Sequence, residues 1–138
     1  MSILADTNAI IALLDRRDKH HTAISQIVED NEILIPATVL PEVDYLVTKY
    51  LGEKVARSFL EALIDGYFQY LPIELIDLID LERTLAIMTR YKDVPLGLVD
   101  SSIIALAEHH QINQILTLDR RHFNIVRPEG IDYFELLP

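Results

Sequence analysis

Apolar residues along the chain fall into two patterns, which are short compact runs and longer stretches with helical spacing. The short runs predict strands at residues 2–6, 33–35, 67–71 and 115–118. In the longer stretches apolar residues return every three or four positions, which predicts amphipathic helices. These helices are expected at residues 9–14, 22–31, 41–50, 54–65, 75–91 and 101–110.

Turn-forming and capping residues separate these elements. Pro36 stops the second run, Thr38 is a candidate helix N-cap, and Pro41 stands where a first helical turn tolerates proline. Residues 92–97 contain both Pro and Gly and predict the clearest loop. The tail at 123–138 is expected to add one or two edge strands.

The order of elements predicts an α/β fold. Strands that alternate with helices, and that are apolar throughout instead of at every second position, indicate a mainly parallel sheet with both faces covered. The chain has 138 residues, which is the usual size of one domain, so we expect a single domain over residues 1–138.

Four acidic residues fall where such a sheet places its ligand site, outside the carboxyl ends of the strands. Asp6 ends the first strand, and Glu42 lies about one turn into the helix after the second strand. Asp100 opens a helix after the Pro/Gly loop, and Asp119 ends a late strand. The sequence therefore predicts that these four carboxylates converge on one edge of the sheet.

Carboxylates gathered in this way repel each other unless a cation lies among them. Their hard oxygen ligands suit Mg²⁺ or Mn²⁺. The chain has no cysteine, so thiolate ligands are excluded, and the adjacent pairs His20–His21 and His109–His110 lack the spacing of a shared helical face. A divalent-metal site made of carboxylates is the prediction.

Each acid also has a simpler interpretation. Asp6 and Asp100 could cap the helices that follow them. Glu42 could be an ordinary first-turn acid that the helix dipole stabilises, and Asp119 could be a turn residue. Four neighbouring polar residues could orient ligands or bound water, although helix capping or a local backbone bond explains them equally well. They are Thr7, Asn8, Ser101 and Thr117. The other acids on the amphipathic helices, Asp80 among them, are read as solvated surface.

Four segments that contain these acids carry a resemblance to a known family. They are LADTN at residues 4–8, IPATVLPEV at 35–43, LVDSSIIA at 98–105 and LTLDRRHF at 116–123. In this order and spacing they cover essentially the whole chain. The sequence resembles PIN-domain ribonucleases and, within them, the VapC-like toxins of type II toxin–antitoxin pairs.

The resemblance implies a three-layer α/β/α PIN-like fold and a Mg²⁺- or Mn²⁺-dependent endoribonuclease. It also implies RNA as the substrate, a cognate antitoxin as a partner, and a homodimer. Asp6, Glu42, Asp100 and Asp119 match the acidic positions of the family, and Thr117 matches its hydroxyl before the last acid. These acids are the candidate catalytic and metal-binding residues.

The net charge of −10 argues against broad attraction of RNA, because RNA is a polyanion. Binding would have to depend on metal ions and on local basic clusters. Candidates for holding the RNA backbone are Arg16, Arg17, Arg120 and Arg121, together with His122, for which a structural role in its turn is the simpler interpretation.

Two other functions remain open from the sequence. One is a noncatalytic module that keeps the PIN fold only to bind RNA or protein. The other is an aspartyl-phosphate phosphotransfer domain, which is disfavoured because Thr7 and Asn8 follow Asp6 in place of an Asp-x-Asp pattern, and because the late strand lacks a following lysine.

The apolar runs near the start are far below the roughly 20 residues that span a bilayer, so no membrane segment is predicted. The N-terminus also lacks the positively charged opening of a secretory signal. We therefore expect a cytoplasmic protein.

Overall fold

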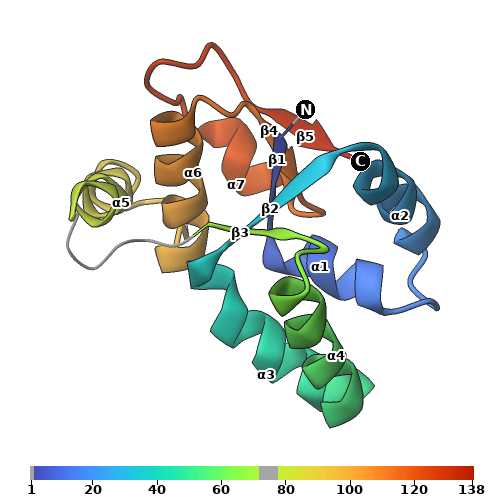
Figure 1. Cartoon of the computed structure of the whole chain (residues 1–138). Coiled ribbons are helices and arrows are strands. Elements are labelled where there is room, and N and C mark those ends of the chain that lie inside the picture. The colour runs from blue at the N-terminus through green and yellow to red at the C-terminus, as the bar shows by residue number, and fades with distance from the viewer. Residues whose placement is uncertain (1, 72–77) are drawn as a thin grey trace.

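A single sheet of five parallel strands organises the protein, seen here in a computed structural model that describes residues 2–71 and 78–138. The strand order is β3-β2-β1-β4-β5, which places β1 at the centre (Figure 1). The strands are β1 (Ser2–Ala5), β2 (Glu32–Pro36), β3 (Gln69–Leu71), β4 (Gln114–Leu116) and β5 (Glu135–Leu137). The predicted α/β class and parallel sheet are confirmed, and every described strand pair is parallel.

Helices cover both faces of this sheet. They are α1 (Thr7–Leu14), α2 (His21–Asp30), α3 (Leu40–Leu51), α4 (Glu53–Ile64), α5 (Ile79–Arg90), α6 (Leu98–His110) and α7 (Arg120–Ile125), with a short 3₁₀ helix, η1 (Ala37–Val39), before α3. The chain moves outward from β1 through β2 to β3 and then returns to β4 and β5. Because parallel crossovers are right-handed, this reversal sends α1–α4 to one face and α5–α7 to the other (Figure 1).

The core lies between the sheet and these helices. Ile3, Leu4, Ile35 and Ile115 are at most 1% exposed, which is why the strands are apolar at consecutive positions. On α6, eight consecutive residues from Ser101 to Glu108 are buried, so this helix is enclosed on nearly all sides.

Three predictions about the elements near the sheet edge are wrong. Thr38 is not the N-cap of α3, because it lies inside η1 and its hydroxyl contacts Ser102 on α6. α6 begins at Leu98 with Gly97 as its N-cap, so Asp100 lies within the first turn instead of opening the helix. The strand predicted at residues 115–118 is β4, which ends at Leu116, two residues earlier than predicted.

The C-terminal part contains a helix that the sequence pattern did not predict. α7 follows Asp119, which is its N-cap and not the end of a strand. The tail then contributes one edge strand, β5. The first residues of the helix predicted at 75–91 lie outside the described residues, within which α5 begins at Ile79.

Within residues 2–71 and 78–138, we find no helix with both the length and the apolar character needed to cross a bilayer.

Candidate active site

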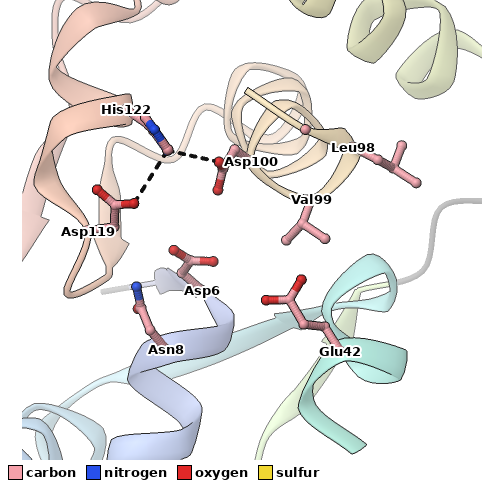
Figure 2. A pocket seen from close by; sticks show the side chains of 9 residues that line it. Asp6, Asn8, Glu42, Leu98, Val99, Asp100, Asp119 and His122 are labelled. Carbon is pink, nitrogen blue, oxygen red and sulfur yellow. Dashed lines mark hydrogen bonds and ion pairs between the residues drawn. The ribbon is translucent and has the colours of Figure 1, made fainter. Parts of the chain in front are cut away.

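The four predicted acids line one cavity of about 360 Å³ (Figure 2). They reach it from four different elements: Asp6 follows β1, Glu42 lies on α3, Asp100 lies on α6, and Asp119 precedes α7. The other lining residues are Asn8, Gly97, Leu98, Val99 and His122. The structure therefore brings these acids together at the carboxyl ends of β1 and β4, where open parallel sheets place their ligands.

Asp6 lies at the base of the cavity and is 5% exposed. It is the N-cap of α1, and its Oδ1 accepts a hydrogen bond of 2.8 Å from the backbone N–H of Thr7. Its Oδ2 accepts a bond of 2.8 Å from the hydroxyl of Thr117. Capping was the simpler interpretation of Asp6, and the geometry shows that one carboxylate both caps the helix and lines the cavity.

The electrostatic setting of Asp6 disfavours its charged form. Burial is the main cause that raises its pKa from 3.8 to about 6. The nearby negative charges of Asp100 and Glu42 also raise this pKa, while the hydrogen bonds from Thr117 and Thr7 lower it. A bound cation would offset both the burial and the repulsion.

Asp100 and Asp119 are joined by the imidazole of His122 (Figure 2). His122 Nδ1 lies 3.2 Å from Asp100 Oδ2 and 3.3 Å from Asp119 Oδ2. Burial raises the pKa of Asp100, and the charges of Asp119 and Glu42 act in the same direction, whereas His122 lowers it. The sequence reading took His122 for a turn residue or phosphate contact, and it missed this bridge because α7 was not predicted.

Glu42 completes the ring of acids from the opposite side of the cavity (Figure 2). Pro41 precedes it in the first turn of α3, and its side chain is exposed. The short helix η1, which directly precedes α3, is held against α6 through Thr38 and Ser102. The Ser102 hydroxyl donates to Val99 O at 2.7 Å, so the Thr38 hydroxyl donates to Ser102 Oγ at 2.6 Å. This bond ties the segment before Glu42 to the helix that carries Asp100.

Thr117 and Asn8 organise the backbone at the end of β4. Thr117 is fully buried, and its Oγ1 accepts the backbone N–H of Asp119 at 3.1 Å while donating to Asp6. Asn8 Oδ1 accepts the backbone N–H of Leu118 at 3.0 Å. These two side chains fix the loop between β4 and Asp119 against the start of α1.

The remaining predicted residues lie outside the cavity that the four acids line. Thr7 Oγ1 and Ser101 Oγ are buried, and neither has a hydrogen-bond partner among the residues that the structure describes. Arg16 and Arg17 line a separate pocket beside Tyr50. Arg120 contacts the carbonyl of Pro138, and Arg121 is exposed at the start of α7. None of these six residues lines the cavity of the acids.

The donor set of the cavity fits a hard divalent cation. Carboxylate oxygens are the ligands that Mg²⁺ and Mn²⁺ prefer. Burial, and to a smaller extent the neighbouring acids, raise the pKa of Asp6 and of Asp100, and a bound cation would favour their charged forms. In the described ranges, no three acidic or histidine side chains already stand in a metal-binding arrangement. Four acids lining one cavity therefore provide the ligand chemistry without a preassembled coordination shell.

A family model for the PIN domain matches residues 3–127. The chain belongs to the PIN-domain family. The resemblance to VapC-like members is confirmed by the ribonuclease VapC26 of Mycobacterium tuberculosis, which is 30% identical over 99% of this chain and 100% of its own length.

Solved structures agree with this membership. The crystal structure of VapC20 from Mycobacterium tuberculosis, described as a sarcin–ricin loop cleaving toxin, has a TM-score of 0.80 at 17% identity and covers 99% of both chains. A toxin–antitoxin complex from Klebsiella pneumoniae contains a chain with a TM-score of 0.67 at 26% identity, covering 96% of this chain and 99% of its own. The PIN fold of this protein is thus shown by sequence and by shape.

Proposed function

We propose that this PIN-domain protein is a Mg²⁺- or Mn²⁺-dependent endoribonuclease whose metal ligands are Asp6, Glu42, Asp100 and Asp119. The observation that carries the proposal is their convergence on one cavity from four separate elements. Helix capping alone does not explain why the acids face one another, because repulsion among carboxylates lowers the stability of the fold.

Membership of the family supports the same activity. A relative that matches this chain over its full length, VapC26, is a ribonuclease, and the four acids lie in the segments by which the sequence resembles the family. A divalent ion bound by these carboxylates would lower the pKa of a coordinated water and offset the negative charge that develops on the phosphate.

The residues of the chain itself would prepare that chemistry. Asp6, with its two oxygens fixed by the Thr7 backbone and by Thr117, presents a rigid ligand at the base of the cavity. Asp100 and Asp119 present ligands from the side held by His122, and Glu42 does so from α3. Arg16, Arg17, Arg120 and Arg121 are exposed and would contact RNA phosphates outside the cavity.

The test compares RNA cleavage by the wild type with that by Asp6→Asn. The substitution keeps the cap, because the amide oxygen can still accept the Thr7 N–H, and Thr117 has further acceptors at 3.4 Å in Asn8 and Asp119. We expect cleavage in Mn²⁺ to fall at least roughly 100-fold, and chelation to reduce the wild type to the same level.

Asp44→Asn is the matched control, because Asp44 is an exposed acid close to Glu42 in sequence that does not line the cavity. It should retain full activity. Wild-type activity in a folded Asp6→Asn protein would refute the assignment, and Mn²⁺-dependent RNA binding without cleavage by the wild type would favour a noncatalytic module.

We further propose that the protein is the toxin of a toxin–antitoxin pair and acts in the cytoplasm as a homodimer. The Klebsiella pneumoniae relative was solved as a toxin–antitoxin complex, which supports this role. Several large apolar side chains are exposed, among them Tyr45, Tyr50, Ile64, Tyr67 and Leu85, and such side chains are common at protein–protein contacts. Light scattering should give the mass of a dimer. A small gene for a DNA-binding protein is expected directly upstream, and co-expression with its product should yield a complex that does not cleave RNA; a monomer that binds no such product would contradict the toxin role.

A further inference from the structure

His122 lines the cavity and contacts the carboxylates of two of its acids. Its Nδ1 atom lies 3.2 Å from Asp100 Oδ2 and 3.3 Å from Asp119 Oδ2, and its side chain is 18% exposed (Figure 2). Asp100 and Asp119 belong to segments far apart in the sequence, at the starts of α6 and α7. The imidazole therefore joins two helix N-termini at the metal-binding edge.

The surrounding structure aims the ring at this position. Phe123 is next to His122 and is 1% exposed, so it anchors α7 in the core. Asp119 is the N-cap of α7, and its Oδ1 accepts the backbone N–H of Arg121 at 3.2 Å, which leaves Oδ2 for the ring. With the helix and the cap both fixed, His122 at the third position of α7 faces back toward Asp119 and across to Asp100.

The two distances describe a shared contact. Hydrogen bonds between a ring N–H and a carboxylate are commonly about 2.7 to 2.9 Å long, and both contacts here are longer. The contact with Asp100 is a hydrogen bond and the contact with Asp119 is an ion-pair distance, so one ring atom faces both carboxylates. The other oxygen of Asp100 has no hydrogen-bond partner in the part of the chain that the structure describes, so it is available to another ligand.

We propose that His122 is a positioning residue, which through Nδ1 holds the carboxylates of Asp100 and Asp119 side by side so that both can bind one divalent ion. The proposal rests on the proposed metal-dependent nuclease function. Two carboxylates left to themselves move apart because they repel, and an ion would then have to gather them. Groups that orient metal ligands are typically worth roughly 10- to 100-fold in metal affinity.

The experiment compares three substitutions at this position. In His122→Asn the amide nitrogen stands near the place of Nδ1, whereas in His122→Gln it reaches the place of Nε2, and His122→Ala removes both. His110→Ala is the control, because His110 is an exposed histidine on α6 that does not line the cavity. Calorimetry gives the Mn²⁺ dissociation constant of each variant, circular dichroism confirms folding, and RNA cleavage is measured alongside.

We expect the Ala and Gln variants to bind Mn²⁺ roughly 10-fold or more weakly, with the Asn variant close to the wild type. Unchanged or tighter binding by a folded Ala variant would overturn the proposal. RNA cleavage that is retained in the Gln variant and lost in the Asn variant would also overturn the proposal, because the ring would then act through Nε2 on RNA. If the Ala variant does not fold, the comparison of Asn with Gln decides.

The wild type separates this proposal from the function on which it rests. A wild type that neither binds Mn²⁺ nor cleaves RNA overturns both. A wild type that binds and cleaves, with variants that bind Mn²⁺ equally well, overturns only the role of His122.

Discussion

Asp6 is buried with its carboxylate close to two other acids, so ionising it costs the folded protein free energy. Its pKa is about 6 in the fold, above the ordinary value of 3.8. Between these two values the folded protein retains a proton that the unfolded chain has released. Stability contributed by this group is therefore present at low pH and is lost as the pH rises through about 6.

This pKa predicts the pH dependence of the metal-free protein. The contribution of Asp6 to the free energy of unfolding should fall by up to about 3 kcal/mol between pH 4 and pH 7. Urea denaturation with a chelator present, at a series of pH values, measures this change. Asp6→Asn carries no titrating group at this position and should lose that part of the pH dependence. The same slope in both proteins would contradict the assignment of the raised pKa to Asp6.

Thr117 has a fully buried hydroxyl that serves two partners at once, Asp6 and the backbone of Asp119. Thr117→Val keeps the shape but leaves both partners unsatisfied, so we expect a loss of about 1 to 3 kcal/mol in unfolding free energy. Mn²⁺ affinity should fall roughly 10-fold, because Asp6 loses the bond that orients it.

Thr117→Ser is the matched control, since it keeps the hydroxyl and removes only a methyl group. It should cost about 1 kcal/mol for the space left behind and retain Mn²⁺ binding. Equal Mn²⁺ affinity in the Val and Ser variants, measured by calorimetry, would show that the hydroxyl does not support the site.

At the scale of elements, the site depends on how α3 and α6 are held together. Thr38 in η1 donates to Ser102 on α6, which carries Asp100. Glu42 lies on α3, which directly follows η1. Thr38→Val removes the donor, while Ser102 still donates to Val99 O. We expect the free energy of unfolding to fall by about 1 kcal/mol. The rate of Mn²⁺-dependent cleavage should fall by more than the accompanying loss of folded protein explains.

Urea denaturation and cleavage assays at saturating Mn²⁺ measure the two effects of Thr38→Val. Thr89→Val is a suitable control, because Thr89 is exposed on α5, does not line the cavity, and donates to Leu85 O within its own helix. If Thr38→Val and Thr89→Val cleave RNA equally well, the bond between η1 and α6 does not position Glu42.

The elements also show what the sequence could predict. Runs such as residues 33–35 are apolar at every position because both faces of the sheet are covered, so the strands and the acids that follow them could be located. α7 escaped prediction because its six residues, RRHFNI, are too short to show helical periodicity. Asp80 was read as a solvated acid, but it is 7% exposed and contacts His109 at 2.7 Å, a pairing that only the packing of α5 on α6 creates.

The same limit applied to the candidate site. That Asp6, Glu42, Asp100 and Asp119 share an edge followed from the rule for parallel sheets, and the structure brings them together. The bridge made by His122 could not be seen, because it depends on the orientation of a helix that was not predicted. The roles of Thr38 and Ser102 likewise depend on a contact between residues 64 positions apart.

At the scale of the whole molecule, a chain with a net charge of −10 gathers four of its acids in one cavity, and the proposed function requires it to accept RNA there. Divalent ions would reconcile the two, because they would neutralise the cavity at the point where a phosphate would enter. β1 and β4 are neighbours at the middle of the sheet, so Asp6 and Asp119, which follow them, lie at the same edge. Glu42 and Asp100 reach that edge from α3 and α6.

Binding of the catalytic metal ion by these four carboxylates is the step on which the proposed function depends. Anomalous diffraction from crystals soaked in Mn²⁺ tests it directly, since Mn²⁺ identifies itself by its scattering. We predict a peak in the cavity at coordination distance from Asp6 and Asp100, with Glu42 or Asp119 completing the set, and no peak in crystals of Asp6→Asn. A strong Mn²⁺ peak elsewhere, or an empty cavity under conditions in which the protein cleaves RNA, would contradict the account.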